Sequence, residues 1–256
     1  GGEQWTKKME GMKEVLMVVT LGMDPTRPSI LYAGTSGGVY KSMDAGKTWK
    51  LMGLPNSFAI PRIVVHPTNP DIVYVAVLGN LWAPNSDRGV YKTTDGGRSW
   101  HHVLKVNDDT GATELAIDAE SPNILYAAMY QRRRTVFGFN GSGAGSGLYK
   151  TTDYGASWTK IDNGIPSNAF SRVVREDDVR KDLLYAGTEL GVFLSWDGGK
   201  NWTRFQLNLP VTPITDLRVH KGNLIASTSG RSFWILDDLS VLRQYKKEMP
   251  AFSVYQ

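Results

Sequence analysis

The hydrophobic residues of this chain fall in short runs that alternate with polar residues and are separated by glycine, proline and asparagine turns. Runs of the form Ile/Leu-x-Tyr-x-Ala/Gly recur near 30–34, 72–76, 124–128 and 183–187. A second kind of run, Gly-Val/Leu-Tyr/Phe, follows at 38–41, 89–92, 147–150 and 191–194. Alternation with a period of two is typical of β-strands, and no segment shows the 3.6-residue period of an amphipathic helix. The pattern therefore predicts an all-β protein.

Four copies of an eight-residue pattern, Ser/Thr-x-Asp-x-Gly-x-x-Trp, follow the second kind of run. They occupy 42–49, 93–100, 151–158 and 195–202, at intervals close to the roughly 40–50 residues of one β-propeller blade. The aspartate can accept hydrogen bonds from the turn that follows it, the glycine supplies a positive φ angle, and the tryptophan begins the returning strand. We interpret these Asp-box residues as structural: Asp44, Trp49, Asp95, Trp100, Asp153, Trp158, Asp197 and Trp202.

Each repeat holds four β segments, which predicts one β-propeller of about five four-stranded blades over residues 1–245. The blades are expected at 12–52, 61–104, 113–161, 170–206 and 214–237, with 246–256 as a C-terminal tail. The fifth repeat has no Asp box, whereas Gly1 to Lys8 look like the end of a box followed by a strand. We expect residues 3–9 to complete the fifth blade, which would remove an exposed sheet edge. The alternative is an arc of a longer propeller.

These repeats resemble the BNR or Asp-box repeat family. The segments 88–97 and 230–238 look like bacterial BNR proteins related to sortilin-type propellers, commonly labelled glycosyl-hydrolase-like, and the resemblance is closest over about 61–245. The first 55 residues look more like the photosystem II assembly-factor-like branch of the same repeat class. The resemblance implies a propeller fold and a periplasmic or secreted location. It implies binding or scaffolding as often as hydrolysis.

Composition narrows the possible partners. The chain has 256 residues, no cysteine and a net charge of +4. The lack of cysteine excludes disulfides and thiolate metal sites, and the small, dispersed charge does not favour nucleic-acid binding. No apolar run is long enough to cross a bilayer, no signal-peptide pattern opens the chain, and the four histidines lack ligand spacing. We expect no cofactor or metal, and the oligomeric state stays open.

Two of the loops that join the second and third strands of a repeat are enlarged, at 79–88 and 131–140. Elaborated loops on a rigid scaffold commonly carry binding, and arginines with aromatic rings can hold an anionic or carbohydrate partner. In the alternative interpretation, the arginines pair with local acids such as Asp108 and Asp109, and the phenylalanines cover a neighbouring blade. The expected contacts are Trp82, Arg88, Arg132, Arg133, Arg134, Phe137 and Phe139.

The innermost strands carry a second set of residues at equivalent positions, expected to line a central channel: Thr20, Arg62, Glu114, Arg172 and Asp216. Across a narrow channel they would form a neutralising ring of ion pairs. In a sharper hypothesis, Glu114 and Asp216 act as acid and base in glycoside cleavage, although an arginine in a neighbouring blade would keep the pKa of each low.

Taken together, these features predict a non-catalytic propeller that binds a protein or glycan partner through its enlarged loops. One alternative is a glycoside hydrolase-like enzyme that uses carboxylates at the channel mouth. Another is an engineered or fragmentary propeller without an activity of its own.

Overall fold

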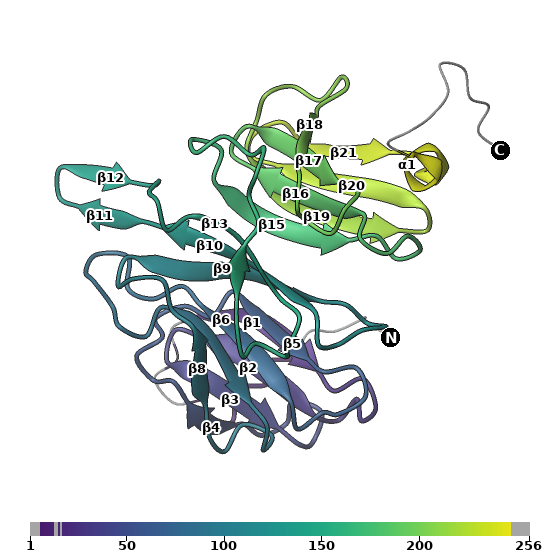
Figure 1. Ribbon diagram of the computed structural model, residues 1–256. Coiled ribbons are helices and arrows are strands. Elements are labelled where there is room, and N and C mark those ends of the chain that lie inside the picture. Colours follow the sequence, from purple (N-terminus) through teal and green to yellow (C-terminus); the bar gives the residue numbers. More distant parts are fainter. Residues whose placement is uncertain (1–5, 13–14, 16, 247–256) are drawn as a thin grey trace. The chain divides into compact units, whose positions relative to one another are not determined.

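The structure of the protein is a computed structural model that describes residues 6–12, 15 and 17–246 (Figure 1). The chain divides into two compact units. The first contains residues 1–146 and 150–159, and the second contains residues 147–149 and 160–256. One propeller across residues 1–245 therefore stays a prediction.

The first unit holds two four-stranded antiparallel sheets in which each strand pairs with its neighbours along the chain. The first sheet consists of β1 (Val18–Met23), β2 (Leu31–Thr35), β3 (Gly38–Ser42) and β4 (Lys50–Gly53). The second consists of β5 (Arg62–Val65), β6 (Val73–Val77), β7 (Gly89–Thr93) and β8 (His101–Leu104). Buried residues of both sheets, among them Tyr32 and Ile63, belong to one hydrophobic cluster.

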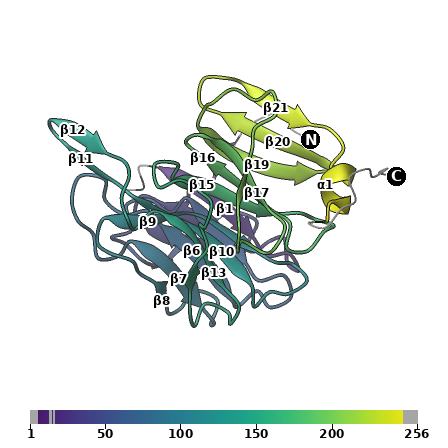
Figure 2. The ribbon, with the colours of Figure 1, turned by 45° about the horizontal axis from the view of Figure 1, so that its top comes forward.

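The third sheet has the order β14-β13-β10-β9. Its strands are β9 (Thr110–Ile117), β10 (Leu125–Gln131), β13 (Gly147–Thr151) and β14 (Thr159–Lys160). Between β10 and β13 the chain forms a separate two-stranded hairpin of β11 (Arg133–Thr135) and β12 (Gly138–Asn140). Figures 1 and 2 show this hairpin projecting beyond β9 and β10. Sequence analysis predicted an enlarged loop there and missed its two strands.

The second unit holds a further four-stranded sheet and a three-stranded one. The four-stranded sheet is β15 (Ser171–Glu176), β16 (Leu184–Thr188), β17 (Gly191–Ser195) and β18 (Thr203–Phe205). The other is β19 (Ile214–His220), β20 (Asn223–Thr228) and β21 (Phe233–Leu236), followed by the helix α1 (Ser240–Gln244). Figure 2 shows β21 at the edge of its sheet. The prediction of an all-β protein built from four-stranded antiparallel sheets is confirmed.

Closure by residues 3–9 is not confirmed. Residues 3–5 lie outside the described residues, and no described residue adds a fourth strand to the β19-β20-β21 sheet. Glu10 instead forms a parallel bridge with Thr48 of the first Asp box.

In the described part of the chain, no helix has the length and apolar character needed to cross a membrane.

A buried tyrosine at the second position of β2, β6, β10 and β16 recurs from sheet to sheet: Tyr32, Tyr74, Tyr126 and Tyr185. The Tyr74 hydroxyl donates to the Tyr154 carbonyl (2.9 Å), and the Tyr185 hydroxyl donates to the Asp177 carboxylate (2.9 Å). Burial raises the pKa of Tyr32 to about 12. Because a buried hydroxyl needs a hydrogen-bond partner, these tyrosines fix where the turns meet the sheets.

Two of the box tryptophans, Trp100 and Trp202, donate a hydrogen bond to the preceding sheet at or just beyond its outer strand. The Trp100 indole N–H donates to the Met52 carbonyl of β4 (3.0 Å), and the Trp202 indole N–H donates to the Ile161 carbonyl just after β14 (2.6 Å). Trp202 is 4% exposed. Each such ring therefore buries a large apolar surface while its one polar atom stays hydrogen-bonded.

Candidate functional site

The four Asp-box carboxylates are used within their own hairpins. Asp153 accepts hydrogen bonds from the Thr151 hydroxyl (2.6 Å), the Ser157 backbone N–H (2.9 Å) and the Ser157 hydroxyl (2.6 Å). The other three boxes repeat this arrangement, with Thr48, Ser99 or Asn201 in the place of Ser157. Gly155 follows with a φ of 89°, a left-handed conformation that favours glycine.

Hydrogen bonding of this kind stabilises the charged form of each carboxylate. Bonds from Thr48 lower the pKa of Asp44 to about 2, and bonds from Ser157 and Thr151 lower that of Asp153 to about 2. Bonds from Ser99 lower the pKa of Asp95 further still. The described residues contain no group of three or more histidines or acids that could hold a metal ion. The boxes therefore offer neither a proton donor near neutral pH nor a metal site.

Arg88 is fully buried beneath the two enlarged loops. Its guanidinium donates to the backbone carbonyls of Asp109 (2.6 Å) and Arg132 (3.0 Å), and also to those of Asn80 and Ala83. Sequence analysis counted Arg88 among the contacts for a partner, but a side chain with no exposed surface cannot make one. Arg88 instead ties the 79–88 loop to the 131–140 segment.

Above Arg88, exposed aromatic rings gather around Arg134. The Arg134 guanidinium carbon lies 5.7 Å from the centre of the Trp82 ring and 6.0 Å from that of Phe139. The Arg134 backbone N–H donates to the Leu81 carbonyl (2.9 Å), which holds the β11–β12 hairpin against the 79–88 loop. Trp82 is 60% exposed and Phe139 is 52% exposed. We call Trp82, Arg134 and Phe139 the aromatic platform.

Next to the platform lies an open cavity of about 430 Å³, with Asp109, Arg133, Phe139 and Asn140 in its lining. Arg133 binds the Asp109 carboxylate (2.7 Å), so the alternative interpretation, pairing with a local acid, describes this arginine. Phe137 at the hairpin tip is 99% exposed and covers no neighbouring strand. Exposed rings beside a polar cavity are the features of a surface that stacks on flat or ring-shaped ligands.

The two candidate carboxylates lie in different units, and each is held by an arginine. Glu114 on β9 is buried and pairs with Arg62 on β5 (2.9 Å). Asp216 on β19 is exposed and pairs with Arg175 on β15 (2.7 Å). Each carboxylate also accepts the backbone N–H of the leucine that follows it (2.9 Å and 2.8 Å). Both are thus fixed in orientation.

Strand register gives most of the predicted inner residues equivalent positions within their own sheets. Thr20, Arg62, Glu114 and Asp216 face equivalent residues of their second strands, namely Gly34, Ala76, Ala128 and Ser227. In the fourth sheet the residue facing the equivalent Gly187 is Val173, which follows the same kind of irregularity as Thr20 in the first sheet and Asp216 in the last, so that Arg172 is the extra residue of the bulge. Arg172 pairs instead with Glu189 of its own sheet. The predicted place of Arg172 is therefore wrong by one residue, since bulges leave no clear sequence signal.

Comparison with protein families gives a match over more than half of the chain. The profile of the family Sortilin-Vps10, described as sortilin, neurotensin receptor 3, matches residues 1–135. The predicted resemblance to BNR or Asp-box propellers of the sortilin type is confirmed.

Curated proteins with similar sequences include a xyloglucanase of Paenibacillus sp, 24% identical over 213 residues, which are 68% of this chain and 19% of that protein. A probable oligoxyloglucan-reducing end-specific xyloglucanase of Neosartorya fischeri is 25% identical over 195 residues, 73% of this chain and 22% of that protein. The chain thus spans about a fifth of the length of these relatives.

Solved structures with a similar fold include the GH74 xyloglucanase from Xanthomonas campestris, with a TM-score of 0.70 and 17% identity over 86% of this chain and 36% of that one. An ancestral GH74 enzyme gives a TM-score of 0.67 and 22% identity over 82% of this chain and 27% of that one. At these identities the likeness concerns the fold alone.

Proposed function

Because the chain belongs to the Sortilin-Vps10 family and its curated relatives are xyloglucanases, we propose that it is a propeller segment of a glycoside hydrolase-like protein that acts on xyloglucan or a similar polysaccharide. The observation that carries the proposal is the agreement of the curated relatives on one substrate class. The expectation of a non-catalytic scaffold is wrong, because these relatives support the hydrolase alternative.

The aromatic platform is the proposed polysaccharide contact. Sugar rings present apolar faces that pack on aromatic side chains, and Trp82 and Phe139 are exposed aromatic residues whose rings both lie near Arg134. A partner of this kind needs no net negative charge, which suits a chain whose formal charge is only +4. A large polysaccharide does not cross membranes, so we propose a location outside the cytoplasm.

Glu114 in the first unit and Asp216 in the second are separate candidates for a catalytic carboxylate, each considered within its own unit. Glycoside cleavage uses a pair of carboxyl groups, one of which stabilises positive charge or activates water. The guanidiniums of Arg62 and Arg175 orient these two carboxylates. In this proposal the arginines act as positioning residues and do not touch the substrate.

The test is hydrolysis of xyloglucan by the purified chain, measured as new reducing ends, with carboxymethylcellulose as a second polysaccharide. We expect turnover on xyloglucan that falls at least about 100-fold in Glu114→Gln, in line with the loss of a general acid–base or nucleophilic group. Asp237→Asn, at an exposed residue, is the matched control. Affinity electrophoresis in xyloglucan-containing gels measures binding separately. A chain that neither binds nor cleaves xyloglucan would refute the proposed function.

A further inference from the structure

Two Asn-Gly pairs occur in the sequence, at 140–141 and at 163–164. In such a pair the backbone nitrogen of the glycine can attack the side-chain amide of the asparagine, because glycine has no Cβ to obstruct the approach. The attack requires an asparagine side chain that can turn toward that nitrogen. The hydrogen bonds of the folded chain therefore decide whether each pair reacts.

The first pair follows the β11–β12 hairpin. Asn140 is the last residue of β12 and is exposed, and residues 141–143 belong to no helix or strand. Within residues 17–246, no hydrogen bond holds the Asn140 side chain, and the Gly141 backbone N–H donates to no acceptor. The side chain of Asn140 can therefore turn toward the Gly141 nitrogen without breaking an interaction of the folded chain.

The second pair is also exposed, but its asparagine is held in place. The Asn163 side-chain amide donates to the Asn201 side-chain oxygen (2.9 Å), and the Asn163 carbonyl accepts the Trp202 backbone N–H (2.9 Å). Gly164 has a φ of 96° and lies so close to the Trp202 carbonyl that no Cβ would fit between them. Turning the Asn163 amide toward Gly164 would break its bond to Asn201. Hydrogen bonding, and not exposure, separates the two pairs.

The surroundings of Asn140 give a change of charge there a consequence. Asn140 faces Arg133 across the hairpin, and both line the open cavity beside the aromatic platform together with Asp109. Arg133 already binds the Asp109 carboxylate (2.7 Å). The segment 121–152 contains no acidic residue. A carboxylate at position 140 would be the first acid of this segment and would face Arg133.

We propose that Asn140 is a site of spontaneous modification, at which the side-chain amide is converted to a carboxylate while Asn163 stays intact. The Gly141 nitrogen gives up its proton and forms a bond to the Asn140 Cγ. The bond between Cγ and the amide nitrogen then breaks, and that nitrogen takes up a proton and leaves as ammonia. Water opens the resulting cyclic imide at one of its two carbonyl carbons, which gives aspartate or isoaspartate.

The product changes the cavity next to the platform. Its carboxylate gives Arg133 a second acid partner beside Asp109, and opposite charges that face each other across two strands attract. Isoaspartate also adds one atom to the backbone at the end of β12, directly after Phe139. The modification would thus alter both the charge of the cavity and the support of an exposed ring. The proposal does not depend on the polysaccharide activity.

The experiment compares the two pairs within one sample. The folded chain is incubated at mildly alkaline pH and digested, and mass spectrometry measures the amide-to-carboxyl change in the peptides that contain Asn140 and Asn163. The chain unfolded in guanidinium chloride is the reference. We expect Asn140 to react at least about tenfold faster than Asn163 in the folded chain, as one or two hydrogen bonds at Asn163 would produce, and the two to react at similar rates when unfolded. Equal rates in the folded chain, or an Asn140 that stays intact while the unfolded chain reacts, would overturn the proposal.

Two variants test the physical reason. Asn140→Gln has a longer side chain that does not form the same ring, so the change at this position should disappear while Asn163 behaves as before. Asn201→Ser removes the acceptor of the Asn163 amide but retains a box residue, because Ser157 has the equivalent place in its own box. We expect the rate at Asn163 to rise by about threefold or more, the value of one hydrogen bond. An unchanged rate at Asn163 in folded Asn201→Ser would show that hydrogen bonding does not protect this residue, and the proposal would lose its basis.

Discussion

The Asp boxes and the aromatic platform use similar residue types in opposite ways. In the boxes, each aspartate is saturated by hydrogen bonds from its own turn, and Trp202 is almost entirely buried. In the platform, Trp82 and Phe139 stay exposed, while the buried Arg88 holds the backbone of the loops that carry them. The repeated residues therefore hold the sheets together, and the residues that occur once leave surface for a partner.

The largest expected effect is the loss of a buried box tryptophan. Trp202→Ala should lower the free energy of unfolding by about 3–5 kcal/mol, because it leaves a cavity and frees the Ile161 carbonyl. Urea unfolding measures the change. Trp82→Ala is the matched control and should change stability by less than about 0.5 kcal/mol. Similar losses in both variants would break the contrast between buried and exposed tryptophans.

The second effect concerns Arg88, which ties together the two enlarged loops that carry the platform. Arg88→Met should cost about 1–3 kcal/mol, because the Asp109 and Arg132 carbonyls lose their donors. It should also weaken xyloglucan binding, since the 79–88 loop and the 131–140 segment are no longer tied together. Arg98→Met, at an exposed box arginine, provides the comparison. If Arg88→Met lowered stability but left the affinity for xyloglucan unchanged, the anchoring of the two loops would not be needed for binding, and this prediction would be wrong.

A smaller effect is the pH dependence that the boxes impose. Hydrogen bonds from Ser157 and Thr151 hold the pKa of Asp153 at about 2 in the folded state, below its ordinary value of 3.8. The box therefore stabilises the folded state above the unfolded pKa, and this stabilisation is lost as pH falls through the folded one. Thermal unfolding of Asp153→Asn should differ from the wild type at pH 6 and converge with it near pH 2. If the difference in thermal stability between Asp153→Asn and the wild type stayed constant from pH 6 to pH 2, the predicted loss of stabilisation at low pH would be wrong.

The fold was predictable because its signals are local and repeated. Ser42, Asp44 and Gly46 specify one hairpin within a few residues, and three further copies confirm the interpretation. The β11–β12 hairpin had no such signal, because it occurs once and its strands have three residues each. The burial of Arg88 could not be predicted from the sequence, because its carbonyl partners lie up to 44 residues away along the chain.

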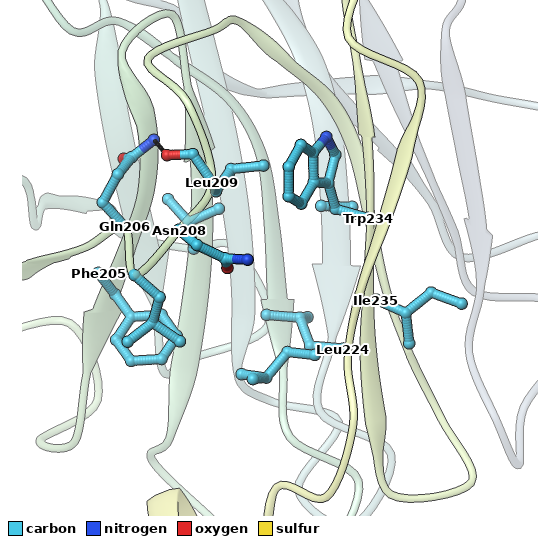
Figure 3. A pocket seen from close by; sticks show the side chains of 11 residues that line it. Phe205, Gln206, Asn208, Leu209, Leu224, Trp234 and Ile235 are labelled. Carbon is cyan, nitrogen blue, oxygen red and sulfur yellow. Dashed lines mark hydrogen bonds between the residues drawn. The ribbon is translucent and has the colours of Figure 1, made fainter.

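The site was predictable only in part. Charge and aromatic content marked Trp82 and Arg134, but only the structure shows the two side by side. The pocket lined by Phe205, Leu224 and Trp234 (Figure 3) was not visible in the sequence, since these residues do not differ in kind from those of other strands.

The most direct test of the central claim is the affinity of the chain for xyloglucan when the aromatic platform loses Trp82. We expect Trp82→Ala to weaken binding by up to about tenfold, the value of one aromatic contact, while the free energy of unfolding stays within about 0.5 kcal/mol of the wild type. Unchanged affinity in Trp82→Ala, together with lost affinity in a folded Asp-box variant such as Asp197→Asn, would show that the repeated residues bind the polysaccharide, and the account would be wrong.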